Sequence, residues 1–441
     1  MAIKTNRLGF ELKEQAALTD VGVRRSHNQD SHGSLPATAL DAWQDRGHVF
    51  LVADGMGAHA VGELASQLAA DLILHTYQKH ATAGPVVALR RSFQEANEKI
   101  HQRGQQNREF QGMGTTSTAL IVRPEGAWIG HVGDSRAYRI RGEQVEQLSF
   151  DHSLQWELAR RQQISPERVA GIPSNVIVRS LGPEAHVQVD VEGPHPVQPG
   201  DVYLLCSDGL SNQLTDQELG AAVTHLPLSE AAQFMIDVAN LRGGPDNITV
   251  VAARLPGAGE STSAPPPPSG LLPTTGVVNL KKYWSSIALG VGIALTVLAL
   301  TLVITGPEFR TLSIVTFLVA AGVLLAGIVG LVGNYRQDQK RDPLADEAPG
   351  PPQVYRRNSC AIDAGLLERL MQTEKGLLEL ARQKNWGVDW NAYEKHHSAS
   401  ILAFQQGKLN LAFVEQARAL ATLFTQLREH RQRDELFKPN W

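Results

Sequence analysis

Residues 48–55 read HVFLVADG, an apolar segment that ends directly in Asp54 and Gly55. A short apolar run that stops at a turn-forming pair is typical of a buried β-strand. Four later segments have the same character, namely residues 117–122, 128–131, 202–206 and 248–253. The chain up to about Leu255 is therefore predicted to form a domain rich in buried strands.

Apolar residues at helical spacing predict two helices among these strands. One face consists of Val61, Ala65, Leu68, Leu72 and Ile73, and the other of Leu89, Phe93, Ala96 and Ile100. Strands followed by a pair of helices and then by more strands indicate sheets covered by helices rather than a regular βαβ repeat.

Composition excludes several classes of protein. The 441 residues carry 41 Lys and Arg against 45 Asp and Glu, without the basic excess of a dedicated nucleic-acid binder. The two cysteines, Cys206 and Cys360, form no CxxC pattern, which argues against a disulfide framework or a cysteine zinc site and favours a reducing compartment. Residues 1–14 lack the apolar run of a signal peptide, so we expect this domain in the cytoplasm.

Aspartates stand at the ends of the predicted strands. Asp54, Asp134 and Asp208 follow apolar segments, Asp246 precedes the last one, and Asp30 lies near the start of the domain. A single aspartate of this kind is usually a turn former or a helix cap. Five of them in one domain suggest a shared site instead.

Carboxylates that lie close together repel one another unless a cation neutralises them. Mg²⁺ and Mn²⁺ prefer oxygen ligands of this type, and the chain has no His-rich or Cys-rich cluster that would favour zinc. Two such ions can hold a phosphate and activate a bridging water, so the pattern predicts hydrolytic attack on phosphorus.

Eight segments resemble the successive motifs of the metal-dependent protein phosphatase family, also called type 2C, and most closely its bacterial branch. They are TDVGVRRSHNQD (19–30), VADGMGAHAVGELAS (52–66), GMGTTSTALIV (112–122), HVGDSRAY (131–138), DHSL (151–154), NVIVRSLG (175–182), PGDVYLLCSDGLSN (199–212) and GGPDNITVV (243–251). The resemblance covers residues 18–255 and implies an α+β fold, an α-β-β-α sandwich of two antiparallel sheets flanked by helices.

The resemblance also implies a metal centre that holds two Mn²⁺ or Mg²⁺ ions. Asp54 is expected to bridge the ions and to act in catalysis, with the backbone carbonyl of Gly55 as a further ligand. Asp208 and Asp246 are expected to complete one metal site. Hydrolysis of phosphoserine and phosphothreonine by a metal-activated water follows as the expected reaction.

Three more residues receive roles from the same resemblance. Asp30 is expected to hold metal-bound water, and Asp134 to help Asp208 bind a third, more weakly held ion. Arg25 matches the catalytic arginine that binds the substrate phosphate, a task that suits a bidentate guanidinium. Its neighbour Arg24 fits an ordinary surface charge.

The chain departs from the family pattern at two positions. Gln29 replaces an acidic residue that is common before Asp30, and Met56 stands where animal members carry a histidine proposed as general acid. His59 lies nearby, at a predicted helix start, and the general acid is left unassigned. Residues 156–174 correspond to the variable flap beside the cleft.

Beyond this domain, residues 256–280 form a Pro, Gly and Ser linker, and two charge-free apolar segments follow at 284–304 and 312–332. Each has about the 20 residues that a bilayer crossing needs. A buried helical hairpin is the alternative. Basic residues flank the pair on both outer sides, so we expect two transmembrane helices with both flanks in the cytoplasm, at the cytoplasmic or inner membrane.

A second linker (335–354) leads to a tail, residues 355–441, predicted as a small all-α module. Its apolar positions at helical spacing are Leu367, Leu370, Leu378, Ala381, Phe413, Ala417, Leu420, Phe424 and Leu427, with Gly387 and Gly407 as breaks. The tail either binds a protein partner or folds back on the catalytic domain.

The sequence thus favours a membrane-tethered phosphatase acting on phosphoproteins, with no nucleic-acid partner. A catalytically silent scaffold or sensor with the same fold is the alternative. A third hypothesis is a phosphatase dedicated to one protein substrate, an anti-sigma-factor antagonist. All five aspartates and Arg25 are present, which argues against the silent form.

Overall fold

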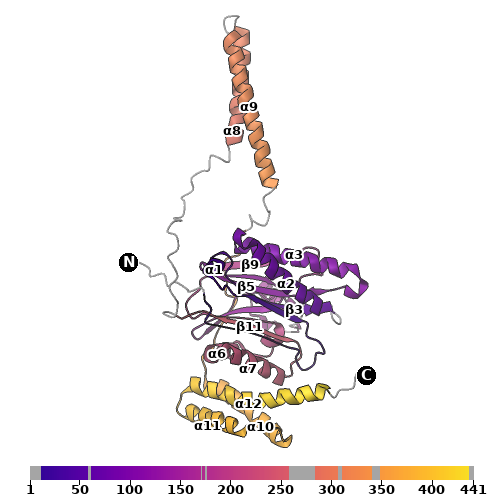
Figure 1. The fold of residues 1–441 in the computed structure, drawn as a ribbon, viewed down its shortest axis with the longest axis vertical. Coiled ribbons are helices and arrows are strands. Elements are labelled where there is room, and N and C mark those ends of the chain that lie inside the picture. The colour runs from indigo at the N-terminus through magenta and orange to yellow at the C-terminus, as the bar shows by residue number, and fades with distance from the viewer. Residues whose placement is uncertain are drawn as a thin grey trace, which may run out of the picture. The chain divides into compact units, whose positions relative to one another are not determined.

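Two six-stranded antiparallel sheets form the centre of the protein in the computed structural model (Figure 1). The model describes residues 11–57, 61–169, 171–173, 176–257, 284–305, 310–339 and 348–436. The chain divides into two units, residues 1–264 together with 349–441, and residues 265–348.

The first sheet contains residues 48–55, the apolar segment that ends in Asp54 and Gly55. It contains, in spatial order, β2 (Asp30–Leu35), β3 (His48–Met56), β5 (Ser117–Arg123), β6 (Gly126–Val132) and β9 (Asp190–His195), with the short β4 (Gly114–Thr115) paired to the end of β3. Asp30 is the register partner of Asp54, which places two of the predicted site residues side by side.

The second sheet joins strands from the two ends of the chain. Its order is β1 (Glu14–Asp20), β11 (Ile248–Arg254), β10 (Val202–Cys206), β7 (Arg136–Arg141), β8 (Gln144–Gln147) and β12 (Arg356–Ser359). The last strand belongs to the tail and pairs antiparallel with β8.

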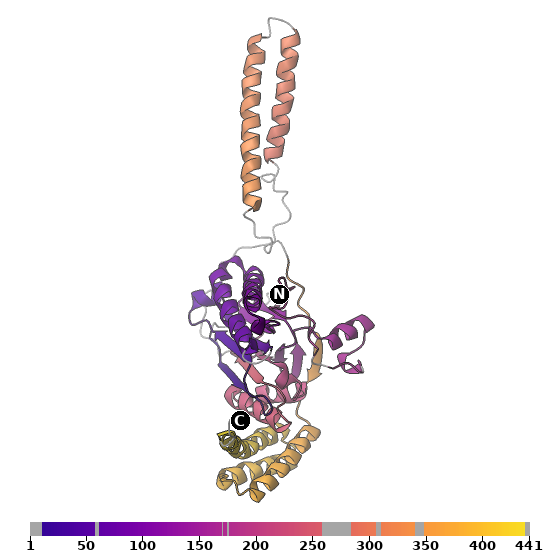
Figure 2. The ribbon, with the colours of Figure 1, turned by 90° about the vertical axis from the view of Figure 1, so that its right-hand side faces the viewer.

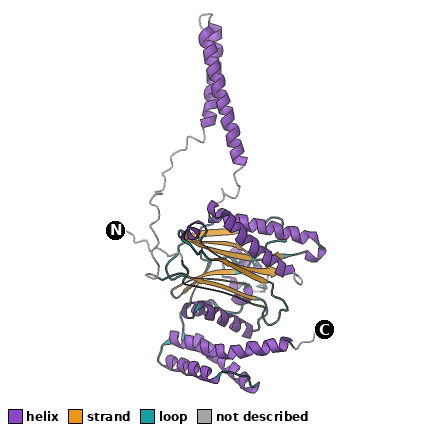
Figure 3. Cartoon of the chain, viewed as in Figure 1, coloured by secondary structure: helices purple, strands orange, loops and turns teal. Residues whose placement is uncertain are grey.

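Apolar side chains of the two sheets meet face to face. Phe50 and Leu120 of one sheet and Tyr203 and Val251 of the other belong to one buried cluster. Helices α2 (Val61–His80) and α3 (Pro85–Gln106) cover the outer face of the first sheet, and α6 (Asp216–His225) and α7 (Leu228–Leu241) cover the second (Figure 3). The predicted α-β-β-α sandwich, its five strands and its first two helices are confirmed.

Short helices occupy the connections between these elements. They are α1 (Leu40–Asp45), η1 (Ala81–Ala83), η2 (Arg108–Phe110), α4 (Leu154–Gln162), η3 (Pro166–Arg168) and α5 (Asp208–Ser211).

The tail forms three helices, α10 (Ala364–Gln383), α11 (Trp390–Gln405) and α12 (Leu409–Leu436), separated near Gly387 and Gly407 as predicted. It differs from the expected all-α module, because residues 356–359 form strand β12. The polar sequence of that strand gives no alternating apolar signal, and only pairing with β8 makes it extended.

The tail also folds back onto the catalytic domain (Figure 2). Leu366, Phe413 and Leu420 of the tail lie in the same buried cluster as Leu219 and Met235 of α6 and α7. The two parts therefore share one hydrophobic core instead of being joined by a linker alone.

Close approach and ion pairs complete this contact. A Cβ on Gly220 of α6 would lie 2.4 Å from Cys360 Cβ, so the tail packs directly against the helix backbone. Arg418 of α12 pairs with Glu230 at 3.2 Å, and Arg428 pairs with the buried Asp237. These pairs fix the direction of α12 across α7.

The second unit consists of helices α8 (Trp284–Thr305) and α9 (Arg310–Gln339), which contain both predicted spans and pack on each other. Gly292 of α8 approaches Leu324 of α9 closely. Among the described residues, one stretch, Leu312–Val329, is long and apolar enough to cross a membrane. The loop 306–309, most of the first linker and residues 340–347 of the second linker lie outside the described residues.

Leu420→Ala should lower the free energy of unfolding by about 2–5 kcal/mol, because it empties a fully buried position of the shared core. Leu411→Ala, on the same helix but half-exposed, should change it by less than about 0.5 kcal/mol. Urea unfolding of the full chain in detergent, followed by tryptophan fluorescence, measures both. Equal effects of the two variants would contradict a common core for the tail and the catalytic domain.

Candidate active site

The structure brings the five predicted aspartates to one edge of the sandwich. Asp30 and Asp54 lie on neighbouring strands of the first sheet, and Asp134 lies in the turn between β6 and β7. Asp208 starts α5 directly after β10, and Asp246 precedes β11 in the second sheet. The charges of the other four all act on Asp54, which marks it as the centre of the cluster.

Crowding and removal from water favour protons on the buried carboxyls of the cluster. Loss of solvent raises the pKa of Asp54 well above its usual range, and the negative charges of Asp30 and Asp208 add to this effect. Burial also raises the pKa of Asp134. Burial raises the pKa of Asp208 too, and the negative charge of Asp246 acts in the same direction.

Asp30 links the two sheets. Its Oδ2 accepts hydrogen bonds from Ser207 Oγ, directly after β10, and from Thr249 Oγ1 on β11, both at 2.7 Å. Burial nevertheless raises the pKa of Asp30 to about 7, with the charges of Asp208 and Asp246 acting in the same direction. The side chain is thus held rigidly by one oxygen.

Three carboxylate oxygens of the cluster have no hydrogen-bond partner among the described residues. Asp30 Oδ1, Asp134 Oδ1 and Asp208 Oδ1 are buried and accept no hydrogen bond from the described residues. Buried oxygens of this kind carry a desolvation cost that a cation would remove. The donor set, carboxylates with no histidine or cysteine among them, fits Mg²⁺ or Mn²⁺.

In the described part of the chain, no three His, Cys, Asp or Glu side chains are gathered closely enough to hold one ion by themselves. A cation here would therefore use main-chain oxygen and water as well as carboxylates, as Mg²⁺ commonly does. Gly55 lies next to Asp54 at a position where only glycine fits, because a Cβ there would lie 2.1 Å from the carbonyl oxygen of Gly62.

Arg25 extends over the cluster. Its guanidinium Nη2 donates to Asp246 Oδ2 at 2.8 Å, and about half of its side chain is exposed. This hydrogen bond raises the pKa of Arg25, as do the charges of Asp54 and Asp208. Arg24 is exposed and has no described contact with the aspartates, so the structure distinguishes the two arginines as the sequence did.

Asn247 is a site residue to which the sequence analysis assigned no role. Its Oδ1 accepts the backbone N–H of Gln29 at 2.8 Å, and its Nδ2 donates to the carbonyl oxygens of Val21 and His27. These bonds fix the loop that carries Arg25. The residue lies inside the GGPDNITVV segment, so the motif contained the signal, but its partners are more than 200 positions away.

The turn that carries Asp134 is held from the DHSL segment. His152 N–H donates to Gly133 O at 2.7 Å, and Gly133 N–H donates to His152 Nδ1 at 3.0 Å. His152 Nε2 in turn lies 3.0 Å from Asp190 Oδ2. Gly133 has a φ of +114°, and a Cβ there would clash with Thr116.

Both departures from the family pattern, Gln29 and Met56, lie near this cluster. Gln29 Nε2 donates to Gly57 O at 3.3 Å, and Met56 is half-buried at the end of β3. His59 lies outside the described residues.

Ser207→Ala should destabilise the metal-free protein by about 1–3 kcal/mol, because Asp30 Oδ2 and the N–H of Thr249 both lose a buried partner. Ser34→Ala, at an exposed position of β2, is the matched control. Urea unfolding in EDTA provides the measurement. An unchanged midpoint for Ser207→Ala would show that this bond does not hold Asp30.

Comparison with known proteins gives a consistent result. The model of the Protein phosphatase 2C family matches residues 23–243. The serine/threonine phosphatase stp of Listeria monocytogenes is 38% identical over 53% of this chain and 92% of its own. The solved Mycobacterium tuberculosis phosphatase PstP/Ppp is 32% identical over 55% of this chain and 98% of its own, with a TM-score of 0.49.

A further solved structure, of the PstP catalytic domain in complex with 2 manganese ions, is 31% identical over 55% of this chain and 98% of its own, with a TM-score of 0.47. The relatives that carry a functional name are protein phosphatases, which confirms the predicted enzyme class. From its motifs, its sandwich fold and the family model that matches half of its length, this chain belongs to the protein phosphatase 2C family.

Proposed function

We propose that the chain hydrolyses phosphoserine and phosphothreonine in proteins at a centre that holds two divalent cations, and that its apolar hairpin tethers it to a membrane. One observation carries the catalytic part. Carboxylates from both sheets converge with buried oxygens that accept no hydrogen bond, and an exposed arginine extends over them.

The proposed ligands are the residues expected from the sequence. Asp54 would serve both cations, the Gly55 carbonyl would be a further ligand, and Asp208 and Asp246 would complete one metal site. Mn²⁺ or Mg²⁺ bound there would neutralise the carboxylates, polarise the phosphate and lower the pKa of a coordinated water. Asp134, whose free oxygen faces the same cluster, would contribute to a third and weaker site with Asp208.

Arg25 would orient the substrate phosphate. A guanidinium can donate two parallel hydrogen bonds to phosphate oxygens, and the contact with Asp246 already directs this side chain over the cluster. Its exposed half leaves donors for a ligand that arrives from solvent. A lysine would provide charge without that paired geometry.

Asp30 would orient the attacking water. Ser207 and Thr249 fix one carboxylate oxygen, so Oδ1 stays free to accept a hydrogen bond from water at the cluster. Positioning of this kind lowers the entropic cost of reaction without any change in the chemistry of the nucleophile.

Membrane attachment would act through local concentration. Helices α8 and α9 present apolar side chains outward within their own unit, among them Val297, Leu300, Leu318 and Leu325. In water such a surface would be unfavourable, whereas in lipid it is the normal state of a span. With basic residues on both flanks, the catalytic domain and tail would lie on the cytoplasmic face, near membrane-bound phosphoproteins.

The first test is catalytic. Full-length protein in detergent should release phosphate from a phosphothreonine peptide with Mn²⁺ or Mg²⁺, but not with EDTA, and Asp208→Asn should abolish this activity. Arg25→Ala should lower kcat/KM by about 100-fold, as loss of a charged group in the transition state does. Arg24→Ala is the control and should stay near the wild-type value. A folded, Mn²⁺-saturated protein without activity would favour the silent scaffold instead.

The second test concerns the membrane. In fractionated cells the full chain should stay in the membrane pellet after alkaline carbonate extraction. A variant in which residues 281–341 are replaced by a flexible Gly and Ser linker should move to the soluble fraction and keep its activity on the peptide. Recovery of the full chain in the soluble fraction would contradict the anchor and would leave a soluble helical hairpin as the explanation.

A further inference from the structure

The segment that follows α9 runs along the edge of the catalytic domain before it reaches the tail helices. We call residues 353–359 the strap. Its second half is β12, and Tyr355 N–H donates to Gln147 O at the end of β8. The family model ends at residue 243, so the strap lies outside the part of the chain that the model matches.

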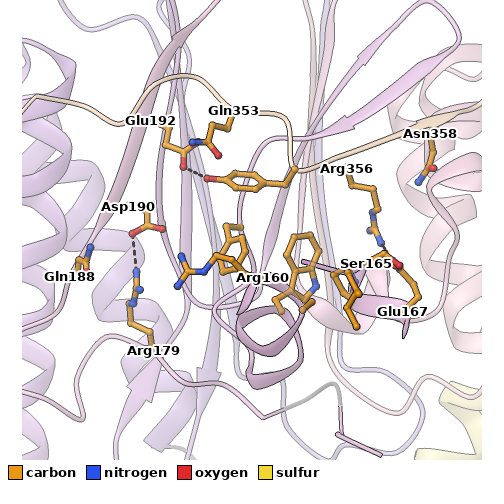
Figure 4. Close-up of a pocket in the computed structure, with 16 residues that line it drawn as sticks. Arg160, Ser165, Glu167, Arg179, Gln188, Asp190, Glu192, Gln353, Arg356 and Asn358 are labelled. Atoms are coloured by element: carbon orange, nitrogen blue, oxygen red, sulfur yellow. Dashed lines mark hydrogen bonds and ion pairs between the residues drawn. The ribbon is translucent and has the colours of Figure 1, made fainter. Parts of the chain in front are cut away.

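The strap lies opposite α4 and η3, residues 154–168, which contain the first part of the predicted flap segment (156–174). From here on, the name flap refers to residues 154–168. Within α4, Trp156 and Ala159 are the buried residues, so the helix has little core of its own. A cavity of about 1020 Å³ lies between the flap, β9 and the strap (Figure 4). The flap therefore lacks continuous packing beneath it, and contacts at its margins must determine its position.

An aromatic contact joins the strap to the flap. The Tyr355 ring meets Phe150 at a centroid distance of 5.5 Å, and Phe150 meets Trp156 of the flap edge-on at 5.3 Å. The Arg160 guanidinium lies 5.0 Å from the centre of the Phe150 ring. The Tyr355 hydroxyl donates to Glu192 on β9, which fixes the ring from its other end.

An ion pair makes the second contact. Arg356 Nη1 lies 3.0 Å from Glu167 of the flap, and Arg356 Nε lies 3.0 Å from Asp216 at the start of α6. Figure 4 shows Arg356 and Glu167 together at one end of the cavity, away from Asp190 and Glu192. The strap arginine thus connects the flap to a helix of the rigid sandwich.

Asp216 is itself well positioned. Thr215 and Glu218 form a capping box at the start of α6, in which each side chain accepts the backbone N–H of the other. Arg356 is therefore held on the sandwich side by a fixed carboxylate. Although burial opposes it, hydrogen bonds from its own backbone and from Arg356 lower the pKa of Glu167, so the flap partner is charged at neutral pH.

The base of the flap adjoins the aspartate cluster. His152, two residues before α4, is hydrogen-bonded in both directions to Gly133, the residue before Asp134. Arg136 lies 6.0 Å from the Trp156 ring centre and pairs with Asp151. A protein chain that extends from a phosphate at the cluster would therefore meet the flap.

We propose that Tyr355 and Arg356 are positioning residues that hold the flap in place, so that the strap determines how well phosphoprotein substrates bind. The proposal rests on the proposed function. When the strap holds the flap in position, the flap offers a preorganised surface to a bound peptide. The entropic cost of ordering the flap then no longer reduces the affinity for the peptide. The chemistry at the phosphate does not depend on it.

The test compares two substrates and two neighbouring arginines in the full-length protein with Mn²⁺. Arg356→Ala and Tyr355→Leu should raise KM for a phosphothreonine peptide by about three- to tenfold, the effect of losing one or two partly exposed contacts. Hydrolysis of para-nitrophenyl phosphate, which is too small to reach the flap, should not change. Arg357→Ala is the matched control, because Arg357 pairs with Glu146 and not with the flap.

A structural readout separates positioning from general destabilisation. Release of the flap should speed tryptic cleavage after Arg161 and Arg168 in Arg356→Ala, with the wild-type rate kept in Arg357→Ala. Glu167→Ala should reproduce the KM change, and the double variant Arg356→Ala with Glu167→Ala should be no worse than either single one.

Three outcomes would overturn the proposal. They are an unchanged peptide KM in Arg356→Ala, a lower KM, which would mean that the strap restrains binding, and equal effects in Arg356→Ala and Arg357→Ala. Failure of the proposed function gives a different result, since neither substrate would then be hydrolysed by the wild-type protein.

Discussion

Repulsion among five carboxylates is the constraint on which the site depends. Asp54 lies at the centre, and the strands on either side bring the other four toward it from both sheets. Such an arrangement is unfavourable without positive charge, and in the described part of the chain Arg25 provides some of it through its ion pair with Asp246. Hydrogen bonds from neighbouring side chains hold some of these carboxylates in place, as those from Ser207 and Thr249 hold Asp30. The same bonds tie the two sheets together, so the sandwich and the site stabilise each other.

The tail is part of the same folded unit as the sandwich. Strand β12 continues one sheet, and α10 and α12 bury their apolar faces on α6 and α7 within one core. Removal of the tail would expose this face of the catalytic domain to water, at roughly 25 cal/mol for each Å² of apolar surface. The catalytic domain of this chain is therefore not a simple copy of the shorter relatives, which match about half of its length.

The apolar hairpin is inserted in the chain between the last strand of the catalytic domain and the strap. The chain leaves the sandwich after β11, forms α8 and α9, and returns through the strap to the edge of the same sheet. The strap follows the hairpin in the chain, and it contacts Glu167 of the flap before the chain reaches the tail helices.

Local signals in the sequence determined the strands, the first two helices and the placement of the aspartates at strand ends. An apolar run that stops at Asp-Gly identifies both a buried strand and the carboxylate beyond it, and helical spacing identified the helices of the tail. The resemblance of the motifs was specific enough to separate Arg25 from Arg24. These features depend on neighbours in the chain, so the sequence contains them.

Only the tertiary structure decided which distant residues and elements contact one another. Asn247, Ser207 and Thr249 act on residues far away in the chain, and no local pattern shows which side chain a hydroxyl will meet. Amphipathic spacing shows that a helix buries one face, but not that α12 buries it on α7. The polar strand β12 is extended because β8 offers unpaired backbone groups at a sheet edge, and such an edge exists only after folding.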